Sequence, residues 1–159
     1  MKKDLIIKPI GYARCSNGIF AIQIEEKYRD ALRGLNEFGH INVVWWFSKC
    51  DNDEQRNKLT LYRPYKGSPE KLGTFASRSP ERPNPIALTV CEVLNVDEGN
   101  GVIRVSFLDA LDGTPILDIK PYTPSFDRVE YLKVPEWQSQ WPKSVEASGT
   151  FDWSSVFNF

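Results

Sequence analysis

The sequence has 159 residues, a length that suits one compact domain with its own hydrophobic core. Its apolar fraction of 41% and charged fraction of 26% are typical of a globular protein and exclude a disordered or fibrous chain. The formal net charge of −1 excludes a globally basic nucleic-acid-binding protein, although it leaves room for a local basic patch.

Cysteine and histidine usage limits the chemistry further. The three cysteines are far apart in the sequence and odd in number, which argues against a disulfide framework and favours free thiols in a reducing compartment. A single histidine leaves too few residues for a zinc site or a Ser-His-Asp triad. The N-terminal MKKDLIIKPIG is too short and too interrupted for a signal peptide, and no run approaches the roughly 18 apolar residues of a membrane span. We therefore expect a cytoplasmic protein that uses no metal and enters no membrane.

The first third of the chain predicts a strand pair followed by a helix. Residues 5–13 and 18–25 read as strands, and the second alternates apolar and polar residues with period two. The Ser-Asn-Gly sequence at 16–18 is typical of a tight hairpin turn. Residues 26–35 carry apolar side chains at helical spacing and predict one amphipathic helix that ends near Gly34.

The middle of the chain predicts further strands and one rigid loop. Residues 40–48 (HINVVWWFS) form an apolar run that must be covered on both faces, by the core or by a partner chain. Residues 58–65 and 72–77 are shorter strand candidates. Residues 79–85 contain three prolines and cannot form regular structure.

The last part of the chain predicts three strands and an irregular tail. Residues 86–96 and 101–108 read as strands joined by a glycine-containing turn, and 116–120 as a last short strand. The segment 128–159 is irregular but rich in tryptophan and phenylalanine, so we expect it to pack on the body or on a partner subunit. Many short strands with one or two short helices predict a mainly β protein, folded as a closed or nearly closed barrel. We expect one domain over 1–159.

The segment GTFASRSPERPNPIAL at 73–88 is the most informative one. Its prolines hold the backbone extended, and it presents two guanidinium groups, Arg78 and Arg82, together with the amide of Asn84. Such a loop suits a carboxylate, phosphate or ribose ligand. The residues alone are equally consistent with a proline-rich connector whose arginines pair with nearby acids.

The segment LDALDGTPILDIKPYTPSFD at 108–127 gathers a second group of polar residues. Asp118 and Lys120 are two positions apart and face the same side of a predicted strand. This pair is either part of a site or a structural ion pair near a barrel rim, and the residues alone slightly favour the ion pair.

Together these segments resemble the TrmO family, also called the TsaA-like or YaeB-like domain. The family hallmarks are a loop of the form F-A-T/S-R-S-x-x-R-P-N-P-I-G/A-L and a later D-G-T-P-V/I-L-D-I-K-P-Y. Here they read FASRSPERPNPIAL and DGTPILDIKPY, and an upstream R-G-L-x-x-F-S-H element appears as RGLNEFGH at 33–40. The resemblance runs in order from about residue 10 to residue 127.

The resemblance implies a single-sheeted β-barrel that works as a homodimer with S-adenosylmethionine. It implies methylation of the N6 nitrogen of the threonylcarbamoyl-modified adenosine next to the tRNA anticodon. Carried over, it assigns three sets of residues. Those expected at the reaction centre are Asp118, Asn84 and Lys120. Those expected to bind the cofactor are Ser48, Lys49, Arg78, Ser79, Leu88, Leu108, Asp109 and Ala110. Those expected to bind the substrate are Arg82, Lys120 and Tyr122.

Two departures from the family pattern keep other functions open. The loop at 14–18 is short where related enzymes have a long one with a P-R-Q element, and a Trp-rich tail replaces their extra C-terminal domain. The acceptor is therefore open: a methyltransferase of this barrel class acting on a small molecule or other substrate is one alternative. A non-catalytic S-adenosylmethionine-binding module is another, because Ser48 stands where the family often has histidine.

A local excess of basic residues favours RNA as a partner. The segment from Arg56 to Arg82 contains seven basic and two acidic residues, a net charge of +5. Tyr62, Tyr65 and Phe75 are interleaved with them and are predicted to stack on unpaired bases. The alternative is a solvated charged face over core aromatics.

Overall fold

The structure is a computed structural model that describes residues 5–158. Its residues divide into two compact units. The first unit contains the chain up to Lys49 and Pro85–Asp127, and the second contains Cys50–Asn84 and the chain from Arg128 onward. The organisation of 1–159 as one domain stays a prediction.

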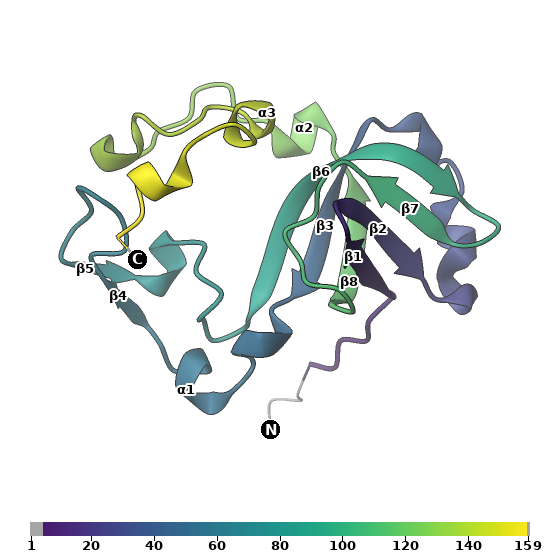
Figure 1. The fold of residues 1–159 in the computed structure, drawn as a ribbon, viewed down its shortest axis with the longest axis horizontal. Coiled ribbons are helices and arrows are strands. Elements are labelled where there is room, and N and C mark those ends of the chain that lie inside the picture. The colour runs from purple at the N-terminus through teal and green to yellow at the C-terminus, as the bar shows by residue number, and fades with distance from the viewer. Residues whose placement is uncertain (1–4, 159) are drawn as a thin grey trace. The chain divides into compact units, whose positions relative to one another are not determined.

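The first unit is a closed antiparallel β-barrel, as the sequence predicts (Figure 1). Its strands are β1 (Gly11–Ser16), β2 (Ile19–Ile24), β3 (His40–Trp46), β6 (Ile86–Asp97), β7 (Val102–Val105) and β8 (Pro115–Pro121). Their order around the barrel is β1-β2-β7-β6-β3-β8, and the ring closes between β8 and β1. A closed barrel leaves no unpaired sheet edge, so every strand finds a backbone partner on both sides.

Alternation along the strands fills the barrel interior. In β3 the side chains of Ile41, Val43 and Trp45 are at most 4% exposed and face the core. Ile22 and Ile103 on other strands are fully buried beside them. The apolar run at 40–48 is therefore explained by burial in its own barrel on the inward face, because β3 pairs with both β6 and β8.

The predicted turn of the N-terminal hairpin is confirmed, but the predicted start of its first strand is wrong. Asn17 and Gly18 have φ values of 51° and 74°, which the predicted Asn-Gly turn supplies. The strand predicted for 5–13 begins only at Gly11, and Leu5 and Ile6 are more than 80% exposed. Apolar residues alone did not make a strand there, because no partner strand pairs with them.

The single helix predicted for 26–35 is wrong in type and length. The segment forms a 3₁₀ helix at Glu26–Leu32 and a second one at Leu35–Glu37, separated by Gly34 with φ of 81°. Only Leu32 of these residues is buried. Tyr28 and Leu35 pack against the core only in part, so the segment buries too little apolar surface to stabilise a full amphipathic α-helix.

The thiols are free, as the cysteine spacing predicts. Cys91 is 1% exposed in the barrel core, and burial raises the pKa of its thiol to about 12. Cys15 and Cys50 are half-buried, and burial raises the pKa of each thiol above its ordinary value.

The second unit begins with a short helix and a two-stranded hairpin. Helix α1 spans Asp53–Arg56, and β4 (Thr60–Tyr62) pairs with β5 (Lys71–Gly73). Both strands are shorter than predicted, since the pairing covers only three residues on each, and a 3₁₀ turn at Thr74–Ala76 follows β5 at once. Residues 79–85 contain no helix or strand, as their prolines predict.

The aromatic tail packs on the hairpin end of the same unit. Besides α2 (Pro124–Asp127), which belongs to the barrel unit, the C-terminal part contains 3₁₀ turns at Glu136–Gln138 and Trp153–Ser155 and helix α3 (Val145–Ser148). The ring of Tyr65, which is 8% exposed, stacks on Trp137 at 5.1 Å between centroids and meets Trp141 edge-on, also at 5.1 Å. The tail therefore has a packing role in this unit, and Phe159 lies outside the described residues.

Within residues 5–158, no helix combines the length and apolar character needed to cross a membrane.

Gly11 allows the close approach of β1 and β2. A Cβ at this position would lie 2.2 Å from the carbonyl oxygen of Gln23, and that neighbour is backbone that cannot swing away. We expect Gly11→Ala to lower the free energy of unfolding by about 1–3 kcal/mol, the usual cost of overpacking. Gly39→Ala is the matched control, because a Cβ there has open space. Urea unfolding of both variants checks this, and equal midpoints would contradict it.

Candidate functional site

The outer face of three adjacent strands brings several predicted site residues together. On β3, Val44 pairs with Leu88 of β6 on one side and with Asp118 of β8 on the other. Because Val43 and Trp45 face the core, Val44 and its two partners face outward. Leu88 is 46% exposed, so this row presents an apolar side chain and a carboxylate on one surface.

A β-bulge lies next to Asp118. The pairing of β3 with β8 runs from Val44 opposite Asp118 to Trp45 opposite Ile116, which leaves Leu117 as the extra residue. Bulges bend a strand and re-aim the neighbouring side chain, and they are over-represented beside active sites. The bulge therefore sets the direction in which Asp118 projects.

Asp118 and Lys120 form the ion pair that their spacing predicts. Lys120 Nζ donates to Asp118 Oδ2 at 2.6 Å, and the backbone N–H of Ile119 donates to Asp118 Oδ1 at 2.9 Å. Hydrogen bonding to Asp118 raises the pKa of Lys120 above its ordinary value. The side chains are 48% and 67% exposed, and ion pairs this exposed contribute little to stability. The Asp118–Lys120 pair is therefore not explained by its contribution to the stability of the fold.

A buried amide beside this row was missed by the sequence reasoning. Asn42 is 8% exposed, and its Nδ2 donates to Oδ1 of Asp127 at 2.9 Å. The other oxygen of Asp127 accepts from the backbone N–H of Thr123 at 2.7 Å. Asn42 pairs with Lys120 in the strand register, and Tyr122 donates its backbone N–H to His40. This network holds the segment after β8 against β3. The signal in the sequence was Asn42 itself, a polar residue within the apolar run of β3.

In the loop after β7, the predicted cofactor residues 108–110 offer mainly backbone groups to a ligand. Leu108 is 1% exposed in the core and Ala110 packs partly against it, so neither offers a reactive side chain. Burial raises the pKa of Asp109, although its residue remains exposed overall. Asp112 anchors the loop by accepting the backbone N–H of Cys15 at 3.0 Å.

Ser48 and Lys49 lie in a 3₁₀ turn at Ser48–Cys50 that follows β3. Both are exposed, and the Ser48 hydroxyl donates weakly to the Trp46 carbonyl at 3.5 Å. Their roles toward a cofactor stay predictions.

Arg82 in the second unit holds the proline-rich loop together. Its guanidinium donates to the carbonyl oxygens of Ser79 at 2.9 Å, Ser77 at 2.8 Å and Thr74 at 3.1 Å. Three acceptors from one planar fork fix the loop from residue 74 to residue 82. This arrangement gives Arg82 a role in positioning the loop. Its contact with the substrate stays a prediction.

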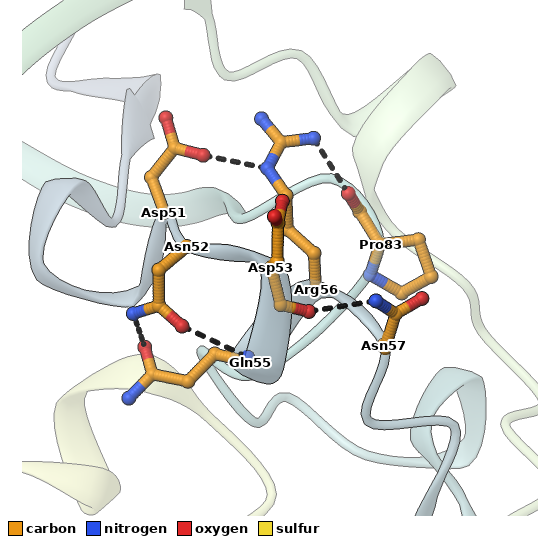
Figure 2. A network of polar contacts seen from close by, with 7 residues as sticks. All are labelled: Asp51, Asn52, Asp53, Gln55, Arg56, Asn57 and Pro83. Atoms are coloured by element: carbon orange, nitrogen blue, oxygen red, sulfur yellow. Dashed lines mark hydrogen bonds and ion pairs between the residues drawn. The ribbon is translucent and has the colours of Figure 1, made fainter.

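A polar network fixes the other end of the same loop. Arg56 pairs with Asp51 and donates to the carbonyl oxygen of Pro83 at 3.0 Å (Figure 2). Lys58 pairs with Glu81 at 2.8 Å. The loop is therefore braced at both ends, and Arg78 and Asn84 lie on its exposed parts while Ser79 is half-buried.

The basic segment is only partly available to a partner. Arg56, Lys58 and Arg82 are engaged with protein groups inside the second unit. Tyr65 is buried in the aromatic cluster, so its predicted stacking on a base is wrong. Tyr62 and Phe75 are 66% and 84% exposed and can serve that role.

Arg82→Lys tests the positioning role. Lysine keeps the charge but cannot reach three carbonyls at once, so we expect a loss of about 1–3 kcal/mol in unfolding free energy and faster proteolysis at residues 75–84. Arg33→Lys, at an exposed position, is the control and is expected to be neutral. Unchanged thermal stability and proteolysis in Arg82→Lys would show that the clamp has no structural importance.

Within residues 5–158 no group of three or more histidine, cysteine, aspartate or glutamate side chains is placed to hold a metal ion.

Comparison with known proteins places these residues in a family. The family model described as the tRNA-methyltransferase O N-terminal domain matches residues 8–128. An S-adenosyl-L-methionine-binding protein of Archaeoglobus fulgidus is 38% identical over 81% of this chain and 97% of its own length. The tRNA (adenine(37)-N6)-methyltransferase of Escherichia coli is 34% identical over 77% of this chain, which spans 52% of that enzyme.

Solved structures agree with this assignment. The crystal structure of TrmO from Pseudomonas aeruginosa superposes with a TM-score of 0.63 at 26% identity, covering 82% of this chain and 61% of that one. The matched residues contain both sequence motifs and every strand of the barrel. The chain therefore belongs to the family defined by the tRNA-methyltransferase O N-terminal domain.

Proposed function

We propose that this protein is an S-adenosylmethionine-dependent methyltransferase that modifies the N6 nitrogen of the threonylcarbamoyl-modified adenosine next to the tRNA anticodon. The observation that carries the proposal is the exposed row on β6, β3 and β8. There Asp118 of the second motif, paired with Lys120, lies on one side of Val44, and Leu88 of the first motif lies on the other. Membership of the family supports it.

The residues present suit the groups of S-adenosylmethionine. Leu88 offers exposed apolar surface for a flat adenine ring, and the backbone of 108–110 offers peptide donors and acceptors. Lys49 is the charged residue of the barrel unit proposed for the carboxylate of its amino-acid end. The cofactor contacts of Arg78 and Ser79, which belong to the second unit, stay predictions from the family resemblance. When bound, the cofactor supplies an electrophilic methyl group on a sulfonium.

Asp118 is the proposed proton acceptor. On taking up the methyl group that a bound cofactor would supply, N6 must lose one proton, and the Asp118 carboxylate would accept it. An exocyclic adenine nitrogen is a weak nucleophile, so an acceptor for that proton helps as charge develops. Lys120 holds the Asp118 carboxylate through its 2.6 Å contact. Asn84 is the second candidate, as a hydrogen-bond acceptor for the amine and not as the group that takes up the proton. Arg82 and Tyr122 are proposed on the substrate side.

Transfer of labelled methyl from the cofactor to tRNA tests the proposal directly. We expect label in one modified nucleoside of tRNA and loss of that nucleoside from a strain that lacks the protein. Binding of the cofactor without label in any tRNA would overturn it.

A binding module without catalysis is the second candidate. It is favoured by one observation: the relative that this chain matches over 97% of its length is named for S-adenosyl-L-methionine binding alone. Transfer to cellular metabolites but not RNA would instead indicate another acceptor, and binding with no transfer at all would indicate the module.

We further propose that the protein acts as a homodimer in the cytoplasm. Exposed apolar side chains in the tail support a second copy as a partner: Tyr131 is 91%, Leu132 70% and Val129 66% exposed. A cytoplasmic location follows from the proposed acceptor. Light scattering is expected to give twice the monomer mass at micromolar concentration, and a monomer mass would contradict the dimer.

A further inference from the structure

The hairpin of β4 and β5 has one buried and one open face. Leu61 pairs with Leu72, which is 8% exposed and packs inward. Tyr62 pairs with Lys71 on the opposite side of the hairpin, since side chains alternate along a strand. Tyr62 is 66% exposed, and Lys71 is exposed as well. The outer face therefore displays an aromatic ring directly beside an ammonium group.

Arg63 extends this face in a fixed conformation. Its φ of 41° is unusual for a residue other than glycine. Its N–H donates to the Glu70 carbonyl at 2.9 Å, and its carbonyl accepts from Asn158 Nδ2 at 2.8 Å. The guanidinium carbon lies 5.5 Å from the centre of the Tyr62 ring, within cation–π range. Arginine and tyrosine are thus arranged as a stack before any ligand is bound.

A hollow opens beside the stack. It has a volume of about 450 Å³ and is lined by Arg63, Lys66, Ser68 and Glu70, among others. Lys66 is exposed and donates to the carbonyl of Ser154 at 3.3 Å. Among the residues that the structure describes, no carboxylate lies within ion-pair distance of the side chains of Arg63, Lys66 or Lys71.

The cations of the basic segment 56–82 differ in whether they are engaged with protein groups, and those on the β4–β5 hairpin are the available ones. Arg56, Lys58 and Arg82 are occupied in bracing the proline-rich loop. The other cations of the hairpin have no acidic partner within ion-pair distance among the described residues, and Arg63 lies against the exposed ring of Tyr62. Phe75, two residues after β5, is a second exposed ring, at 84%. Exposed rings beside positive charge are the features that hold unpaired bases and their phosphates.

We propose that the outer face of the β4–β5 hairpin, formed by Tyr62, Arg63 and Lys71 with Lys66 in its connecting loop and Phe75 two residues after β5, binds a single-stranded segment of the RNA substrate. Tyr62 and Phe75 stack on unpaired bases, and the three cations contact the phosphates. The inference rests on the proposed function for the identity of the RNA as tRNA.

Fluorescence anisotropy with an anticodon stem-loop RNA and with whole tRNA tests this face. Each of Tyr62→Ala and Phe75→Ala is expected to weaken binding by roughly 5- to 100-fold, the range for loss of one stacked base. Tyr62→Phe keeps the ring and is expected to bind as the wild type does. Lys71→Gln is expected to reduce the slope of log affinity against log salt by about 0.7, as for one lost phosphate contact.

Controls separate this face from general charge and from the methyltransferase reaction. Phe126→Ala and Arg33→Gln remove an exposed ring and an exposed cation elsewhere, and are expected to change RNA affinity less than twofold. All variants are expected to keep the wild-type affinity for S-adenosylmethionine and the wild-type melting temperature.

The outcomes distinguish the two proposals. Wild-type RNA affinity in Tyr62→Ala and Phe75→Ala overturns the face, even if the protein methylates tRNA. RNA binding that these variants lose supports the face, even if no methyl transfer to tRNA is found. Absence of RNA binding by the wild type overturns it, and so does preferential binding of an acidic peptide through the same residues.

Discussion

Asp118→Asn is expected to lower the single-turnover rate of methyl transfer by about 10²–10⁴ while leaving cofactor binding intact. Asparagine has nearly the same shape as aspartate and fits the bulged strand, but it cannot take up the proton that N6 must lose. The contact with Lys120 is exposed, so its loss costs the fold little. Melting temperature and single-turnover rate at saturating cofactor, measured on the same preparation, check this prediction.

A second carboxylate provides the matched control for this substitution. Asp30 is fully exposed and pairs with Arg33 at 3.8 Å on a 3₁₀ helix of the barrel unit. Asp30→Asn is expected to retain both rate and stability. If Asp118→Asn melts earlier yet transfers methyl at the wild-type rate, the carboxylate has only a structural role, and Asn84 becomes the residue to test.

The barrel could be predicted from the sequence because its signals are local. Alternation in 19–24 and 86–97, the Asn-Gly turn and the apolar run of β3 each report a strand without knowledge of its partner. The predictions that were wrong depended on whether a segment has a neighbouring strand or a packing surface in the fold. Leu5 and Ile6 have strand-forming character but no strand beside them, and the segment at 26–35 buries only one side chain. Local pattern does not contain that information.

The candidate site divides in the same way. The alternation rule placed Asp118 and Lys120 on one side of β8 correctly. It could not show that Leu88 and Val44 stand in the same row, because that depends on the registers of β3 with β6 and β8. Nor could it show that Arg82 binds three carbonyls of its own loop, since each contact depends on a backbone path set by three prolines.

Trp141→Ala is expected to lower the free energy of unfolding of the second unit by about 2–4 kcal/mol. The indole of Trp141 meets the rings of Tyr65, Trp137 and Trp153 edge-on, at centroid distances of 5.1, 5.7 and 5.5 Å. Each such pair contributes about 0.5–1.5 kcal/mol beyond the area it buries. The indole is half-buried, so the loss falls below that of a fully buried tryptophan.

The effect should be confined to the unit that contains the cluster. Trp141 contacts residues of the tail and of the segment 50–84, and both belong to the second unit. Hydrogen exchange is therefore expected to increase at Tyr65 and 136–157 while the amides of β2, β3 and β6 keep their protection. Val145→Ala shortens a side chain that is 52% exposed in the same unit and is expected to change the free energy of unfolding by less than about 0.5 kcal/mol. If Trp141→Ala raised exchange in the barrel strands to the same extent, the two units would unfold as one cooperative body, which is the outcome that the single-domain prediction requires.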